Sequence, residues 1–115
     1  NKTCIPCYNK TVAEKGKPGE VISGKPETSL QNYYTDKSGA VFSGGWESTV
    51  GKWRVNYSED EFCAILKGKV TLTADGGKAE TFVAGDAFVI PAGFRGTWET
   101  IEPVRKLYAI HEKKA

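Results

Sequence analysis

The sequence predicts an all-β protein that folds as one small antiparallel sandwich or barrel. Segments with aromatic and β-branched residues alternate with Gly, Pro, Asn and Asp turn signals about every 6 to 12 residues, which gives about eight to ten strands. No segment shows the roughly 3.6-residue apolar period of an amphipathic helix. A chain of 115 residues can build one compact core and leaves little for a second domain.

The first half of the chain predicts an arm followed by three strands. Residues 1–27 are rich in Gly, Pro, Lys and Glu, which is typical of an extended N-terminal arm with loops. A single barrel domain is expected over residues 28–115. Its first three strands are expected at residues 28–35, 40–49 and 51–58.

The second half predicts further short strands separated by tight turns. Two strands, a hairpin turn of sequence Asp-Gly-Gly and a returning strand are expected at residues 61–68, 69–74, 75–77 and 78–84. Three more strands are expected between Gly85 and Pro91, at residues 94–101 and at residues 104–112. The last two would be joined across Glu102–Pro103.

The composition excludes several classes of function. With 16 basic and 14 acidic residues the net charge is +2, and no basic run is interleaved with aromatic residues, so nucleic-acid binding is not implied. No apolar run approaches the roughly 18 residues of a membrane span, and no signal-peptide pattern is visible. Three cysteines are too few for a secreted disulfide scaffold. We therefore expect a cytoplasmic protein without a membrane or nucleic-acid partner.

Two of the cysteines, Cys4 and Cys7, form a CxxC sequence that invites a zinc or redox interpretation. A zinc site needs about four ligands, and the only histidine is His111, near the other end. A thioredoxin-type motif belongs in a βαβ unit, and no helical pattern follows Cys7. The simpler interpretation is two thiols in a loose arm.

Two groups of residues in the C-terminal half resemble the two sequence motifs of the cupin superfamily. Glu61 and Gly68 keep the spacing at the end of the first motif, and Gly85, Pro91 and Gly93 keep the spacing of the second. Cupins are small double-stranded β-helix barrels, similar to jelly rolls, which usually hold a metal with histidines and this Glu. In this sequence the His-x-His positions fall on Val55 and Tyr57, or on Arg54 and Asn56, and the later His position falls on Gly96.

A closer resemblance is to short, uncharacterised bacterial cupins that are similar to the cupin domains of ureidoglycine aminohydrolase. It is carried by DEFCAILKGKVTLT at residues 60–73, GD..VIPAGFRGTWE at 85–99 and EPVRKLYAI at 102–110. The aminohydrolase uses a bound metal. Because only Glu61 among the ligand positions can bind a metal well, we expect neither a metal nor another cofactor here.

Strand alternation predicts what fills the barrel instead. If Glu61 faces inward, so do its same-face neighbours Cys63 and Ile65. Upstream, Trp53, Val55 and Tyr57 form the corresponding set. Trp98 lies two residues after Gly96, so its indole could take the space of a histidine and metal, with Gly96 making room.

The last strand offers two inward sets, which are Lys106, Tyr108 and Ile110, or Arg105, Leu107 and Ala109. We favour the first, because a buried Glu61 carboxylate needs a cation and Lys106 can supply it. The predicted pocket residues are therefore Trp53, Tyr57, Glu61, Cys63, Trp98, Lys106 and Tyr108. Each has a simpler interpretation, with Trp98 as core, Cys63 as a small buried residue and the charges as a structural ion pair. His111 is expected to be exposed.

Three functions remain open. The favoured one is a metal-free cupin that binds a small polar metabolite, with Lys106 and Arg95 or Arg105 meeting an anionic part. The second is a metal-independent enzyme, an acid–base isomerase or aminohydrolase-like protein acting on a nitrogen-containing or sugar substrate through Tyr57, Glu61, Lys106 and Tyr108. The third is a structural protein whose barrel is simply filled. A homodimer is expected in each case, because cupins commonly pair sheet to sheet.

Overall fold

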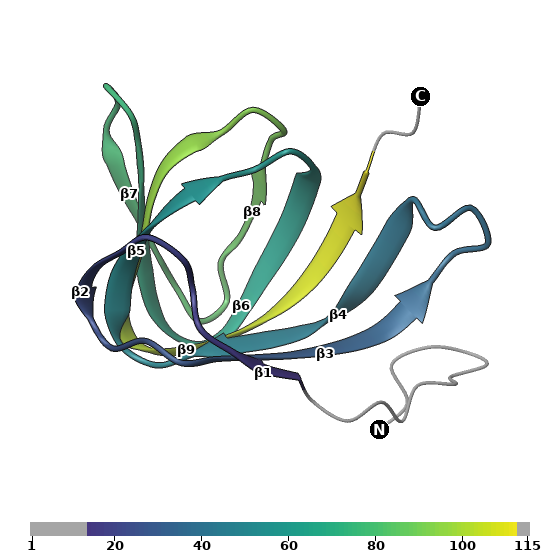
Figure 1. Ribbon diagram of the computed structural model, residues 1–115, viewed down its shortest axis with the longest axis horizontal. Coiled ribbons are helices and arrows are strands. Elements are labelled where there is room, and N and C mark those ends of the chain that lie inside the picture. Colours follow the sequence, from purple (N-terminus) through teal and green to yellow (C-terminus); the bar gives the residue numbers. More distant parts are fainter. Residues whose placement is uncertain (1–13, 113–115) are drawn as a thin grey trace.

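The computed structural model describes residues 14–112, and within this range it contains nine strands and no helix (Figure 1). The strands are β1 (Glu14–Gly16), β2 (Val21–Gly24), β3 (Thr28–Thr35), β4 (Val41–Ser48), β5 (Gly51–Asn56), β6 (Asp60–Ala74), β7 (Ala79–Val83), β8 (Ala87–Ile90) and β9 (Arg95–His111). The predicted all-β class is confirmed. Cys4 and Cys7 lie outside the described residues. No helix in this part of the chain could cross a membrane.

Two long strands, β6 and β9, hold the fold together. They pair antiparallel from Asp60↔His111 to Ala74↔Gly96. The first part of β6 also pairs with β8 and its second part with β7, while the two parts of β9 pair with β5 and β4. The nine strands form one continuous hydrogen-bonded sheet that curls into a barrel (Figure 1). Its two halves, β1-β3-β4-β9-β6-β8 and β2-β5-β9-β6-β7, share β6 and β9 and are called the two sheets below.

The length of β6 and β9 corrects the sequence prediction, which divided each into two strands. The prediction ended one strand at Gly68 and began another after Pro103. The structure instead bends β6 at Gly68, which has a φ of +92°, and the register shifts at this point. A Cβ at residue 68 would overlap the carbonyl oxygen of Pro103, so the two bends are packed together. These residues mark corners within continuous strands.

The described part of the N-terminal arm pairs with both sheets. β1 pairs with β3, and β2 pairs with β5, so the segment between them passes from an edge of one sheet to an edge of the other. The backbone N–H of Arg54 donates to the carbonyl of Glu20 and holds the end of this segment. The proposed boundary at residue 27 stays a prediction.

The inner faces of the two sheets follow the predicted alternation. Trp53, Cys63, Ile65 and Trp98 are all buried, each at 5% exposure or less. The choice between the two faces of the last strand is also settled by burial, because Lys106 is 4% exposed and Leu107 is 39% exposed. Lys106 and Tyr108 therefore face inward, as expected.

Candidate functional site

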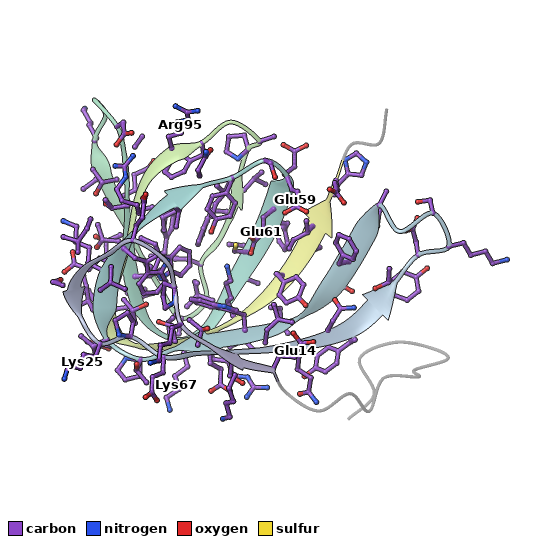
Figure 2. All side chains as sticks on the ribbon, viewed as in Figure 1. Glu14, Lys25, Glu59, Glu61, Lys67 and Arg95 are labelled. Atoms are coloured by element: carbon purple, nitrogen blue, oxygen red, sulfur yellow. The ribbon has the colours of Figure 1, made fainter. Side chains whose placement is uncertain are left out.

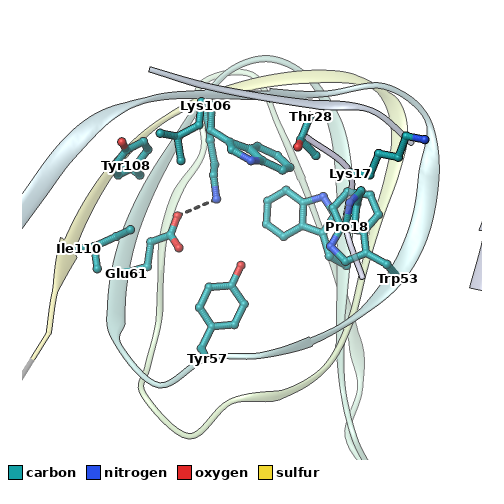
Figure 3. Close-up of a pocket in the computed structure, with 12 residues that line it drawn as sticks. Lys17, Pro18, Thr28, Trp53, Tyr57, Glu61, Lys106, Tyr108 and Ile110 are labelled. Atoms are coloured by element: carbon teal, nitrogen blue, oxygen red, sulfur yellow. Dashed lines mark hydrogen bonds and ion pairs between the residues drawn. The ribbon is translucent and has the colours of Figure 1, made fainter. Parts of the chain in front are cut away.

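A cavity of about 290 Å³ lies between the two sheets (Figure 3). Its walls combine aromatic rings with a small number of charged and hydroxyl groups. The lining residues are Lys17, Pro18, Thr28, Leu30, Trp46, Trp53, Tyr57, Glu61, Trp98, Lys106, Tyr108 and Ile110. They come from both sheets, from the segment that follows β1 and, for Tyr57, from the turn between β5 and β6.

A buried ion pair forms one side of the cavity. Glu61 on β6 and Lys106 on β9 lie on neighbouring strands, and the Lys106 Nζ donates to Glu61 Oε2 at 2.6 Å (Figure 3). Their side chains are only 9% and 5% exposed. The predicted contact between these two residues inside the barrel is confirmed.

The ammonium of Lys106 has further neighbours on its other sides. Its Nζ lies 3.6 Å from the Sγ of Cys63 and donates to it. It also lies 4.8 Å from the ring centroid of Trp46 and 4.6 Å from that of Trp98, within the range of cation–π attraction. The charge is thus surrounded by a carboxylate, a sulfur and two aromatic faces.

Two oxygen atoms at the ion pair, one of Glu61 and one of Tyr57, have no hydrogen-bond partner within residues 14–112. Glu61 Oε2 accepts from both Lys106 and the thiol of Cys63, at 3.3 Å for the latter, whereas Oε1 makes no hydrogen bond within residues 14–112. The hydroxyl of Tyr57 also makes none to this part of the chain, and Figure 3 shows it pointing into the cavity. Tyr108 differs, because its hydroxyl donates to Asn32 Oδ1 at 2.9 Å. No fully buried side-chain N or O atom among the described residues lacks a partner, so the unpaired oxygen of Glu61 faces the cavity.

Three tryptophans form the wall next to the ion pair. Trp46 packs edge-on against Trp98 with ring centroids 5.3 Å apart, and Trp53 stacks on Trp98 at 6.3 Å. The indole N–H of Trp98 donates to Thr100 Oγ1 at 2.9 Å. The Thr100 hydroxyl also hydrogen-bonds to the Ser48 hydroxyl at 2.7 Å. These two hydrogen bonds hold the Trp98 ring in the orientation in which its face contacts the Lys106 ammonium.

Burial shifts the pKa values of the groups around the cavity. The pKa of the Cys63 thiol is raised to about 12, chiefly by burial, with the Lys106 charge acting in the opposite direction. Burial and then the charge of Glu61 raise the pKa of Tyr108 to about 12, and burial also raises that of Tyr57. For Lys106, burial disfavours the charged form, but the negative charges that Tyr57, Glu61 and Cys63 can carry outweigh it and raise the pKa. At neutral pH the lysine is therefore charged, and the thiol and phenols are neutral.

These shifts predict a loss of stability at high pH. The unfolded state releases the Cys63 proton near the ordinary pKa of 9.0, while the folded state retains it up to about 12. Because the folded state then binds more protons, the free energy of unfolding should fall by about 1.4 kcal/mol per pH unit for this group between these values. Lys106 acts in the same direction, since its stabilisation is complete below 10.5 and is lost as the pH rises through the folded value.

Urea unfolding of Cys63→Ala between pH 8 and 11 measures the contribution of the thiol. At pH 8 the variant is expected to be less stable than the wild type. Above pH 9 its free energy of unfolding should fall less steeply, by about 1.4 kcal/mol per pH unit, because it lacks the one titrating proton of the thiol. Equal slopes for the variant and the wild type would show that Cys63 does not titrate differently in the folded state.

Six of the seven predicted pocket residues line the cavity, namely Trp53, Tyr57, Glu61, Trp98, Lys106 and Tyr108. Cys63 does not line it and lies behind the ion pair, fully buried. The prediction that Arg95 or Arg105 supplies a cation to the site is wrong, because neither residue lines the cavity. Figure 2 shows Arg95 on the outside of the barrel, and Arg105 is exposed beside Glu47. His111 is exposed, as predicted.

The structure also corrects the reason for glycine at residue 96, which was expected to make room for the indole of Trp98. A Cβ at this position would overlap the carbonyl oxygen of Thr73 on the neighbouring strand β6. Glycine is therefore required by the close approach of two backbones, and it does not serve to make room for the indole of Trp98.

Sequence reasoning missed several lining residues, above all Trp46. The alternation of Gly44, Trp46 and Ser48 along β4 carries the signal that Trp46 faces inward. The sequence could not show that β4 pairs with the strand that carries Lys106. Lys17 and Pro18 were missed because their position depends on the segment between β1 and β2.

Two curved antiparallel sheets that curl around a cavity with inward-facing Glu61 define a protein of the cupin class. Within that class, the chain belongs to the family described as the EutQ-like cupin domain, whose family model matches residues 35–108. No curated protein matches the chain.

Solved structures of cupins resemble the fold. A DUF861-family protein of unknown function from Pseudomonas syringae is 24% identical, with a TM-score of 0.78, and the match covers 88% of this chain and 45% of that one. The EutQ protein of Clostridium difficile is 17% identical over 77% of this chain and 65% of its own, with a TM-score of 0.68. The chain thus spans less than two thirds of either protein.

A DUF861-family protein from Thermotoga maritima is more similar in sequence over a shorter stretch. It is 41% identical, with a TM-score of 0.54, and the match covers 56% of this chain and 73% of that one. The resemblance to ureidoglycine aminohydrolase stays a prediction.

The side chains present do not fit the metal that cupins usually hold. Of the positions at which the resemblance places ligands, Glu61 carries a carboxylate, Val55 and Gly96 carry no donor, and Tyr57 carries a phenol whose pKa is raised by burial. The Lys106 ammonium lies 2.6 Å from that carboxylate, where a cation would otherwise be bound. Within residues 14–112 no group of three or more His, Cys, Asp and Glu side chains could hold a metal ion.

Proposed function

We propose that this domain is a metal-free cupin that binds a small polar metabolite in the cavity between its sheets. One observation carries the proposal. Beside the Lys106–Glu61 pair, Glu61 Oε1 and the Tyr57 hydroxyl face a space of about 290 Å³ without a hydrogen-bond partner in the described chain. Convergent polar groups on aromatic walls are what small-molecule sites provide.

The cavity favours binding over a barrel that is merely filled. A filled barrel would cover or pair both carboxylate oxygens, whereas Glu61 Oε1 faces the open cavity and can accept a hydrogen bond from a ligand. The volume is at the lower end of the range for ligand pockets, which suits a small metabolite.

The charge states favour binding over acid–base catalysis. The pKa values of Tyr57 and Lys106 are both raised, so neither group accepts a proton near neutral pH. Glu61 is the remaining candidate base, and the ammonium of Lys106 already holds it. The metal-independent isomerase or aminohydrolase-like enzyme is therefore the alternative function.

Blocking the cavity provides the test. A panel of small sugars, amides, carboxylates and amino acids is screened for a rise in melting temperature of the wild type. At least one compound is expected to bind and stabilise it, by about 2.7 kcal/mol at a concentration 100 times the Kd. In Thr28→Trp, an indole placed on the cavity wall should abolish that rise.

Thr35→Trp is the matched control, because Thr35 lies on the same strand β3, is exposed and does not line the cavity. This variant should respond as the wild type does. A panel in which no compound stabilises the wild type would contradict the proposal, and so would stabilisation that persists in Thr28→Trp.

A further inference from the structure

We infer that the cavity selects an uncharged ligand that carries an N–H or O–H donor beside an acceptor, as amides, ureas and diols do. The inference rests on the proposed function and names the class of ligand for that site. It follows from which polar atoms at the cavity are already paired and which are open.

The ammonium of Lys106 is a poor receptor for an anion. An ammonium has three N–H donors, and here it donates to Glu61 at 2.6 Å and to Cys63 at 3.6 Å. Its other neighbours are the faces of Trp46 and Trp98. An incoming carboxylate would have to share the ammonium with Glu61, whose negative charge repels it.

Within residues 14–112, no second cation is placed to receive an anion. Arg95 and Arg105 do not line the cavity. Lys17 contributes to the wall, but it is exposed, and Figure 3 shows its ammonium pointing away from the ion pair. Its charge is therefore screened by solvent.

A cationic ligand meets the opposite difficulty. The open oxygen of Glu61 could accept from it, but the ammonium of Lys106 lies next to the same carboxylate. Two of the aromatic faces that would attract a cation, those of Trp46 and Trp98, are already occupied by this lysine. A second positive charge would enter a poorly solvated site beside the first one, which is unfavourable.

An uncharged donor–acceptor group satisfies both open atoms. Its N–H or O–H can donate to Glu61 Oε1, which only accepts. Its carbonyl or hydroxyl oxygen can accept from the Tyr57 hydroxyl, which burial keeps protonated. Its flat or apolar part can pack on Trp53, which lines the cavity and is not one of the rings that the Lys106 ammonium contacts.

Three planar probes of nearly the same shape test the inference. Benzamide is neutral, benzoate is an anion and benzamidinium is a cation, and their binding to the full chain is measured by calorimetry at pH 7. Benzamide is expected to bind at least about tenfold more tightly than either ion. Tighter binding of an ion would overturn the inference alone, whereas no binding of any probe would refute the proposed function as well.

Variants of the ion pair should change which of the three probes binds most tightly. Glu61→Gln leaves the lysine charge unbalanced and should favour benzoate, and Lys106→Met should favour benzamidinium. The double variant removes both charges and should again favour benzamide. An unchanged order in the two single variants would overturn the inference, and the double variant tests it even if a single variant fails to fold.

Two Tyr→Phe variants test whether the hydroxyl of Tyr57 contacts the ligand. Tyr57→Phe should weaken benzamide binding about three- to tenfold, the effect of one hydrogen bond. Tyr33→Phe is the control, because the Tyr33 hydroxyl lies 3.5 Å from Gln31 and does not line the cavity. Equal affinity of wild type and Tyr57→Phe would show that this hydroxyl does not contact the ligand.

Discussion

Lys106→Met is expected to lower the free energy of unfolding by about 3–5 kcal/mol, the cost of leaving one member of a buried ion pair without the other. The Glu61 side chain is 9% exposed, and Lys106 provides its shortest hydrogen bond, at 2.6 Å. Without the ammonium, the carboxylate must stay charged in an apolar wall or take up a proton. Urea unfolding at pH 7 measures the difference from the wild type.

The double variant Lys106→Met/Glu61→Gln is expected to be more stable than Lys106→Met alone, because it removes the unpaired charge as well. Arg54 and Asp75 provide the control, since they form an exposed ion pair at 2.7 Å on the outside of the barrel. Arg54→Met should cost less than about 1 kcal/mol. If Lys106→Met costs no more than Arg54→Met, the buried pair does not hold the fold as described.

Gly68→Ala is expected to lower the free energy of unfolding by more than about 3 kcal/mol. The left-handed backbone at a φ of +92° costs an L-residue about 1–2 kcal/mol. The new methyl group would also overlap the Pro103 carbonyl, and displacing a packed neighbour costs about 1–3 kcal/mol more. The measurement is again the midpoint and slope of urea unfolding.

Gly93 separates the two causes. Its φ is +93°, and a Cβ at this position would meet nothing within 4 Å. Gly93→Ala should therefore cost only the backbone strain of about 1–2 kcal/mol. Equal losses in the two variants would mean that β6 and β9 move apart easily at their bends.

The strand pattern could be read from the sequence because each sheet has one buried face. Alternation along β6 and β9 placed Glu61, Cys63 and Lys106 correctly, and burial of a carboxylate then required a cation. The Asp-Gly-Gly turn likewise predicted the hairpin between β6 and β7. Strand alternation and turn residues depend only on neighbours in the sequence, and the pairing of a buried charge depends only on its sign.

The features that the sequence did not predict depend on contacts between distant residues. Gly68 and Pro103 read as strand ends, because turn signals do not distinguish a corner from an end. Trp46 could be placed beside Lys106 only once β4 was known to pair with β9. The same holds for Gly96, whose need for glycine comes from the carbonyl of Thr73.

The sharing of β6 and β9 by both sheets has a consequence for how the domain assembles. The hairpin at residues 73–79 is local, but Asp60 must find His111, 51 positions further along the chain. Topologies dominated by such distant pairings fold slowly, in roughly milliseconds to seconds. Because β9 borders β4 in one sheet and β5 in the other, neither sheet is complete until this strand has left the ribosome. Until then β6 has only β7 and β8 as partner strands, and the barrel cannot close over its inner face.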